Sequence, residues 1–379
     1  MPSTDPATLA RIVVWGGLVL GLVLGAVGQS TRFCVRGAIA DWVQLRQPGR
    51  LVSWLLAVAV GAIAVQALVS AGAFDATRTI AWGERFPWLS YLAGGLMFGY
   101  GMILAGGCPQ RCLVKAGSGN LKALVTLVLV AIVSTMTLRG AFAGLRVNGF
   151  DSFAASLGGS QDLGAVLGRA LSSSAGTMRW LVTLLVSAGV LALGWRVRAQ
   201  VKPAHWIGGI AVGLLVAAAF YLTGKIGFLP ENPETLEPAW LGTQSKRPEG
   251  LSFSAPLGHA LDLLTLWSDK ATVATFGVMV ALGVLLGAFA TAKLRGDFKL
   301  ESFRTPGELG AHSAGALLMG FGGITALGCS LGNGVTGMAL LSSGALLATL
   351  GITGGAWLAL KRKSSSPSAS ALPASQAAG

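Results

Sequence analysis

Long apolar stretches separated by short polar connections run along almost the whole chain. They begin near residues 12, 51, 89, 121, 178, 206, 272, 310 and 344, and each is about as long as the roughly 20 residues that cross the hydrocarbon core of a bilayer. This pattern predicts an all-α polytopic membrane protein with about nine transmembrane helices. One integral domain accounts for the chain apart from its two ends.

The same pattern predicts the boundaries of that domain. We expect an external N-terminal segment (1–11), a membrane domain (12–360) built from two halves at about 12–140 and 178–360, and a cytoplasmic C-terminal tail (364–379). The tail reads SSSPSASALPASQAAG, which cannot bury enough apolar surface to order itself. We therefore predict that the tail is disordered.

Two apolar stretches are copies of each other, and each leads directly into a cysteine. Residues 93–108 read AGGLMFGYGMILAGGC and residues 314–329 read AGALLMGFGGITALGC. Aligned without a gap, nine of the sixteen positions are identical. The chain is therefore an internal duplication, a pattern that favours a transporter with two equivalent half-sites.

Charge refines this picture. Hydrophobic residues make up 53% of the chain and charged residues only 11%, yet the formal net charge is +13. The basic residues lie in short loops after every odd-numbered span, where they set orientation rather than bind nucleic acid. Representative positions are Arg32, Arg36, Arg46, Arg50, Arg111, Lys115, Lys122, Arg196, Arg198, Lys202, Lys293, Arg295, Lys299, Arg304, Lys361, Arg362 and Lys363.

Because Lys and Arg favour cytoplasmic loops, the odd-numbered spans should end in the cytoplasm and the N-terminus should lie outside. The segment 225–257, rich in Pro and Glu, is then an external loop. Five spans separate the ends of the two repeat copies, so the copies should cross the membrane in opposite directions. This arrangement is an inverted repeat, which places a shared site near the bilayer midplane.

Cysteines mark the points where helices should break. Cys34 lies in GQSTRFCVRGAIAD, Cys108 and Cys112 lie in GGCPQRCLVKAG, and Cys329 lies in GCSLGNGVTG. Pro109 and the surrounding glycines predict that the chain leaves the helix at Cys108, and glycines predict the same at Cys329. Any one cysteine would fit as a small core hydrophobe, but three at interruptions favour a functional path. Short helices that restart there would favour an anion at their N-termini.

Several polar residues beside these breaks are candidate site residues. Gln110 and Arg111 follow Cys108, and Asn333 adds a polar group after Cys329 in an otherwise apolar setting. Arg36 and Arg111 are either electrostatic attractors for an anion or anchors for cytoplasmic loops, and the sequence leaves both interpretations open. A soft-metal site formed by Cys108 and Cys112 is the main rival, although no His, Asp or Glu lies nearby to complete it. We expect no cofactor and no enzymatic activity.

Taken together, the motifs GQSTRFCVRGAIAD, GGCPQRC followed by LVKAGSGNLKAL, and ALLMGFGGITALGCSLGNGVTG resemble the YeeE/YedE sulfur-transport family of bacterial inner-membrane proteins. The resemblance covers about residues 12–360. It implies a compact bundle with inward-folded short helices, thiosulfate or a related sulfur anion as substrate, and a central path marked by Cys34, Cys108 and Cys329. Cys112 is not part of that trio. The family also implies a small cytoplasmic sulfur carrier of the TusA type as a partner, and some relatives are associated with selenium.

A mechanism follows from the chemistry of such an ion. Thiosulfate is a dianion, so cysteines that help it along should be neutral thiols, whose weak S–H donors bind it without trapping it. Moving a dianion inward against the membrane potential costs roughly 4.6 kcal/mol per 100 mV, which favours uptake driven by consumption in the cytoplasm. Three alternatives remain: a cysteine persulfide that relays sulfur, a soft-metal permease, and a structural scaffold.

Overall fold

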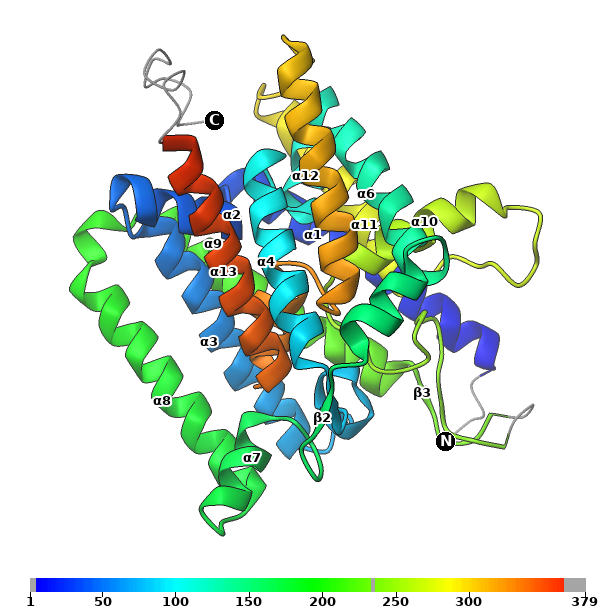
Figure 1. Cartoon of the computed structure of the whole chain (residues 1–379). Helices are drawn as coiled ribbons and strands as arrows, with labels where there is room; N and C mark the ends of the chain where they lie inside the picture. The colour runs from blue at the N-terminus through cyan, green and yellow to red at the C-terminus, as the bar shows by residue number, and fades with distance from the viewer. Residues whose placement is uncertain (1–4, 233–235, 365–379) are drawn as a thin grey trace.

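The structure is a computed structural model that describes residues 5–232 and 236–364. Helices dominate the described chain (Figure 1). They are α1 (Pro6–Thr31), α2 (Val35–Ala40), α3 (Gly49–Ser70), α4 (Trp88–Leu104), α5 (Pro109–Gly117), α6 (Leu121–Arg139), α7 (Leu163–Ala170), α8 (Ala175–Arg196), α9 (Pro203–Tyr221), α10 (Ser254–Thr265), α11 (Phe276–Leu294), α12 (Pro306–Thr325) and α13 (Ser343–Ser364). A π-helical turn, η7, covers Gly332–Gly337.

Strands form only two short antiparallel pairs in the described chain. One joins β1 (Arg85–Phe86) to β2 (Ala155–Ser156), and the other joins β3 (Phe228–Leu229) to β4 (Ala239–Trp240). Both pairs lie in connections between helices, where they brace loops.

Among the described residues, eight helical segments are long and apolar enough to cross a membrane. They cover 6–45, 49–70, 88–117, 121–139, 175–196, 203–226, 276–294 and 343–363. The ninth expected span corresponds to α12, which has 20 residues but begins with PGELGAHSAG and is therefore more polar at its start. The predicted class, an all-α polytopic membrane protein, is confirmed.

The predicted chain ends fall largely outside the described residues. Residues 1–4 of the N-terminal segment lie outside them, and the rest of that segment is already helical because α1 begins at Pro6, with Pro at a position where its missing N–H costs nothing. Of the predicted tail, only Ser364 is described, as the last residue of α13.

The internal duplication is visible in how α4 packs against α12 at the centre of the bundle (Figure 1). A Cβ added at Gly94 would lie 2.6 Å from the backbone N of Ala326, and one added at Gly101 would lie 2.6 Å from the carbonyl O of Gly315. As the residue number rises along α4, the contacted residue number falls along α12, so the two equivalent helices are antiparallel. The two copies of the repeat are thus related by a pseudo-two-fold axis, as an inverted repeat requires.

Helices of the two halves also pack against each other in pairs. α1 packs along α11 and α3 packs along α9, each pair in parallel, so every long helix of one half lies against a helix of the other. Glycine makes these contacts close, because a Cβ at Gly209 would lie 2.6 Å from the carbonyl O of Ser53, and one at Gly213 would lie 2.8 Å from that of Ala57. The halves therefore form one interlocked bundle whose centre is the α4/α12 contact.

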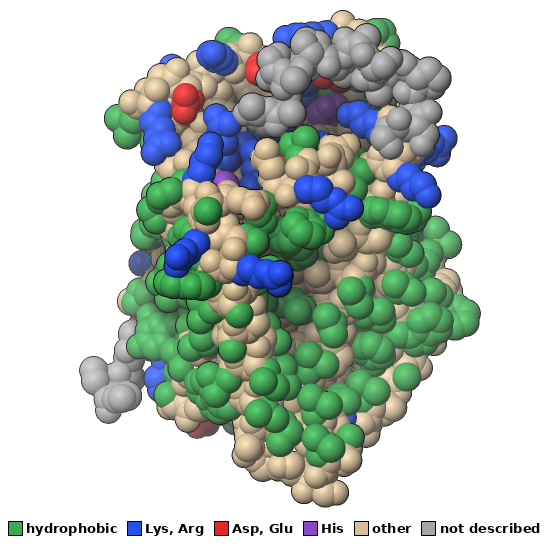
Figure 2. Space-filling model, turned by 90° about the vertical axis from the view of Figure 1, so that its left-hand side faces the viewer, with side chains coloured by type: hydrophobic (Ala, Val, Ile, Leu, Met, Phe, Trp, Pro, Cys, Tyr) green, Lys and Arg blue, Asp and Glu red, His purple; other side chains and the backbone are tan. Residues whose placement is uncertain are grey.

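The outer surface separates charge from apolar residues. Figure 2 shows Lys and Arg side chains gathered toward one end of the molecule, above a largely hydrophobic flank. α8 stands at the periphery and packs on α3 and α7 (Figure 1). Its exposed residues include Leu181, Leu184, Leu185, Leu191 and Trp195. An apolar flank of this kind is what a helix facing lipid presents.

Candidate functional site

Each copy of the repeat ends in a helix break, as the sequence predicts. α4 ends at Leu104, Gly106 adopts a positive φ of 70°, and α5 restarts at Pro109 after an extended Cys108. α12 ends at Thr325, and the chain turns through Leu327, whose φ of 56° is unusual for a residue with a side chain. The two breaks place one cysteine each inside the bundle.

The three cysteines of the expected trio are free and almost fully buried. Cys34, Cys108 and Cys329 are 7%, 1% and 1% exposed. The Sγ of Cys34 accepts a hydrogen bond from the Gly37 N–H at 3.3 Å at the start of α2, and the Sγ of Cys329 accepts one from the Gly332 N–H at 3.3 Å. Two of the three sulfur atoms are therefore fixed by backbone N–H groups that follow a break.

Cys108 neighbours both of the other two cysteines. Its thiol is within electrostatic range of both Cys34 and Cys329. The side chain of Ser330 lies near this thiol but forms no hydrogen bond with it. The structure thus brings together one cysteine from each motif, although the three lie far apart in the sequence. Cys112, which was left out of the trio, is also buried but has a different neighbour, described below.

Buried donors without a protein partner lie next to these cysteines. Within the described residues, no protein group hydrogen-bonds Gln110 Nε2, Ser330 Oγ or Arg36 Nε. Gln110 is 1% exposed and Ser330 is fully buried. A buried donor left unpaired costs free energy, and such groups in a native protein commonly await a ligand or water. All three donors suit an anion.

Arg111, one of the predicted arginines, lies near Cys34 and Cys108. Arg111 Nη1 donates to the carbonyl O of Gly28 at 3.3 Å, and its guanidinium is within electrostatic range of Cys34, Cys108, Arg32 and Arg50. Arg111 therefore anchors α5 to α1 and also carries positive charge to the cysteines. The two interpretations that the sequence left open are compatible at this residue.

Cys112 and Asn333 occupy equivalent positions in the two repeats, since both lie four residues after the break cysteine. Cys112 Sγ lies 3.6 Å from the carbonyl O of Gly107, and Asn333 Nδ2 donates at 2.9 Å to the equivalent carbonyl of Gly328 and, also at 2.9 Å, to that of Ala326. Each side chain satisfies a carbonyl that the broken helix leaves without an N–H partner. The gapless repeat alignment already contained this signal.

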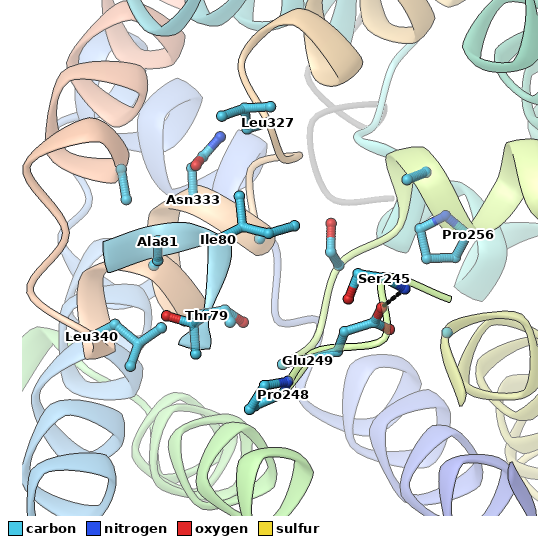
Figure 3. A pocket seen from close by; sticks show the side chains of 18 of the residues that line it. Thr79, Ile80, Ala81, Ser245, Pro248, Glu249, Pro256, Leu327, Asn333 and Leu340 are labelled. Atoms are coloured by element: carbon cyan, nitrogen blue, oxygen red, sulfur yellow. Dashed lines mark hydrogen bonds between the residues drawn. The ribbon is translucent and has the colours of Figure 1, made fainter. Parts of the chain in front are cut away.

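A cavity of about 440 Å³ reaches the second break. Ser252 and Gly332 line it, and both lie against Cys329, with Ser252 Oγ 4.0 Å from Cys329 Sγ. In Figure 3, Thr79, Ile80, Ala81 and Leu340 face the loop that carries Ser245, Pro248 and Glu249, with Asn333 and Leu327 near one end. Cys329 thus lies directly behind two residues of the cavity wall.

Sequence reasoning missed most of this cavity. Its wall comes from the connection before β1, which contains Ile80, and from the loop before α10, which contains Ser252 and Glu249. Ser252 precedes α10 much as Cys34 precedes α2, so the second half carries a hydroxyl near the place where the first half carries a thiol. Only the order of helices in the two halves could have indicated Ser252.

These features define a polytopic membrane protein made by internal duplication, with buried thiols and unpaired donors at paired helix breaks. A family model described as sulphur transport matches residues 30–358, and the chain belongs to that family. The thiosulfate transporter TsuA of Escherichia coli (strain K12) is 26% identical over 378 residues, covering 92% of this chain and 96% of that protein. TsuA of Spirochaeta thermophila is 25% identical over 353 residues, covering 91% and 97%.

The family resemblance predicted from the motifs is therefore confirmed, as is the assignment to sulfur transport.

Proposed function

We propose that this protein carries thiosulfate, or a closely related sulfur anion, into the cytoplasm along a path marked by Cys329, Cys108 and Cys34. The placement of Cys108 within electrostatic range of both other thiols, with Cys329 directly behind the cavity wall formed by Ser252 and Gly332, carries this proposal. The names of the two relatives support thiosulfate as the substrate.

The chemistry of the path suits a dianion with a soft terminal sulfur. A neutral thiol, unlike a thiolate, does not repel a dianion. Neutral S–H groups then offer a row of weak donors, and Ser252, Ser330 and Gln110 add stronger ones beside them. Several modest sites in sequence allow the ion to move on, whereas a single strong cationic site would hold it.

The direction of transport follows from the charge on the two ends of this path. The cavity end, at Cys329, is bordered by serines and a glycine, while the other end lies close to Arg111, Arg32 and Arg50. Basic residues favour the cytoplasmic side, so we propose that the cavity opens outward, with the N-terminus outside and the C-terminus in the cytoplasm of a bacterial inner membrane. The ion then moves toward increasing positive charge.

Uptake of a dianion against the membrane potential requires a sink or a coupled process. We propose that a cytoplasmic sulfur carrier of the TusA type removes the ion as it arrives. Deleting the cytoplasmic acceptors should then lower net uptake, and unchanged uptake would contradict this part of the proposal.

Growth on thiosulfate tests the proposed function. A strain without its own sulfate and thiosulfate permeases should grow on thiosulfate when complemented with this chain, and should fail with Cys34→Ala, Cys108→Ala or Cys329→Ala. Cys112→Ala is the matched control, because it removes an equally buried thiol outside the trio. Growth of all three trio variants at equal membrane abundance would overturn the thiol path.

The persulfide alternative predicts a different chemical species. If a cysteine carried sulfur covalently, mass spectrometry of the purified protein after incubation with thiosulfate would show an added sulfur atom on a trio cysteine. The proposed path predicts an unmodified chain.

A further inference from the structure

The cavity contains two titratable groups that the cysteine path does not use. Glu249 and His259 both line it, and among the lining residues that the structure describes, Tyr91 of α4 is the only other one with a titratable side chain. A carboxylate is unexpected in an outer chamber that has to admit a dianion. Glu249 therefore requires an explanation that the cysteines do not supply.

Glu249 is held in a fixed place at the cavity wall. Its Oε1 accepts a hydrogen bond from the Ser245 N–H at 2.8 Å, as Figure 3 shows, and its backbone N–H donates to Thr223 Oγ1 at 3.1 Å. Thr223 Oγ1 donates in turn to the Glu249 carbonyl at 2.8 Å. The Ser245 N–H thus fixes the carboxyl group, and Thr223 fixes the backbone of Glu249.

No cation in the described part of the chain forms a salt bridge with Glu249. Lys246 and Arg247 precede it in the same loop but are exposed to solvent. From α10, His259 is paired with Asp262 at 3.4 Å and contacts Arg139 of α6 at 3.3 Å, so its local charges belong to a separate cluster. The other lining residues of α9, α11 and η7 are uncharged.

We propose, building on the proposed function, that the cavity is a proton-dependent loading site for the anion, at which Glu249 must be neutral before the dianion can occupy the cavity beside Cys329. A sphere of the cavity's volume has a radius of about 5 Å, which is shorter than the screening length of about 8 Å at physiological ionic strength. A charged Glu249 and a dianion in this space therefore repel each other with little screening from salt.

The surroundings of Glu249 shift its pKa in the direction that this role requires, and His259 adds positive charge at lower pH. Burial raises the pKa of the Glu249 carboxyl above its ordinary value, which moves its protonation toward neutral pH. Burial also lowers the pKa of His259, with Arg139 acting in the same direction and Asp262 opposing both, so this imidazole gains its charge only at lower pH. Acidification therefore makes the cavity less negative through Glu249 and then more positive through His259.

The proton controls access to the path rather than the direction of transport. Anion loading and protonation of Glu249 are linked, so each favours the other, and the proton need not travel with the ion. Sink-driven uptake is compatible with this arrangement.

The test uses the full-length protein in liposomes and measures initial uptake of labelled thiosulfate between about pH 5 and about pH 9, a range in which the ion stays a dianion. Above the pKa of Glu249, uptake by the unaltered protein should fall by up to about tenfold per pH unit. Glu249→Gln keeps the acceptor oxygen for the Ser245 N–H, and its uptake should stay at the acidic level across the range.

Two variants serve as controls. Glu249→Asp should keep the pH dependence. Glu231→Gln removes an exposed acid earlier in the same 225–257 loop and should leave the profile unchanged. A second measurement is independent of transport. Adding thiosulfate to purified protein in weak buffer should cause proton uptake, which Glu249→Gln should abolish.

The outcomes separate the two proposals. Uptake that is independent of pH, or a Glu249→Gln profile that matches the unaltered protein, overturns the loading site and leaves the proposed function intact. Absence of thiosulfate uptake at every pH overturns the proposed function and the loading site with it.

Discussion

The break after α4 and the break after α12 come from the same ancestral segment, yet they have different surroundings. At the first, Pro109 starts the regular helix α5, which carries Arg111 and Lys115. At the second, the chain forms the π-helical turn η7, which is uncharged and borders the cavity. The residues before each cysteine are alike, so the difference arises from PQRCLVKAG on one side and SLGNGVTG on the other.

A symmetric scaffold can support directional chemistry when its two copies differ after the shared segment. The antiparallel α4/α12 contact fixes the positions of the two breaks, and the residues that follow decide what each break does. One break borders the cavity, and the other lies close to positive charge. Duplication thus supplies the geometry, and later divergence supplies the polarity on which the proposed direction of transport depends.

The two breaks are also secured from outside in comparable ways. After the first, the Leu121 N–H donates to the carbonyl O of Glu301 at 2.8 Å, and after the second, the Leu163 N–H donates to that of Leu341 at 2.8 Å. The second contact has stronger support, because fully buried Asp162 lies beside it and pairs with Arg179 at 2.8 and 3.1 Å. Arg179 also stacks over the ring of Trp82 at 4.0 Å.

Replacing Asp162 should produce the largest loss of stability at the second break. Asp162→Ala leaves the Arg179 guanidinium without its buried partner and removes the cap on the Ala165 N–H at the start of α7. Breaking a buried pair on one side costs about 3–5 kcal/mol. Thermal unfolding in detergent measures the change, and a loss below about 1 kcal/mol would mean that this contact does not secure the break.

Acid titration of the unaltered protein checks the same pair without a substitution. Burial opposes ionisation of Asp162, but hydrogen bonds from Arg179, Ser160 and the Ala165 N–H outweigh it and lower the pKa of this carboxyl. Its stabilising contribution is therefore complete at neutral pH and is lost as the pH falls through the lowered pKa. Glu301→Gln at the first break, where the acid is exposed, is the matched control and should leave stability almost unchanged.

Asn333→Ala should have the next largest effect. It removes two hydrogen bonds at 2.9 Å and leaves the buried carbonyls of Ala326 and Gly328 unsatisfied, which should cost about 2 kcal/mol. Because Asn333 also lines the cavity, uptake should fall as the second break loosens. Equal stability of Asn333→Ala and the unaltered protein would show that the cap is dispensable.

Much of this arrangement could be predicted from the sequence. Apolar length indicated the spans, the repeat indicated antiparallel copies, and Pro109 with its flanking glycines indicated the first break. These features are local, or depend on one alignment, so a single sequence contains them. The family motifs added the trio of cysteines.

The cavity could not be predicted in the same way. Its wall brings the residues around Ile80, the loop with Ser252 and Glu249, and η7 together from parts of the chain separated by many spans. Nothing in the local pattern of the 225–257 loop indicates which of its acids faces inward. That information lies in long-range packing, which neither periodicity nor composition encodes.

Cys112→Ala should have the smallest effect and is the most direct comparison of the two breaks. Its thiol occupies the position of Asn333 but contributes a single weak S–H donor at 3.6 Å to the Gly107 carbonyl. Lys115 Nζ already donates to the neighbouring Gly106 carbonyl at 3.1 Å, so the first break keeps a strong polar contact without Cys112. We expect a loss of less than about 1 kcal/mol, together with unaltered thiosulfate uptake. Measured beside Asn333→Ala under the same conditions, a larger loss for Cys112→Ala would reverse the proposed ranking, and lost uptake in a stable protein would add Cys112 to the thiol path.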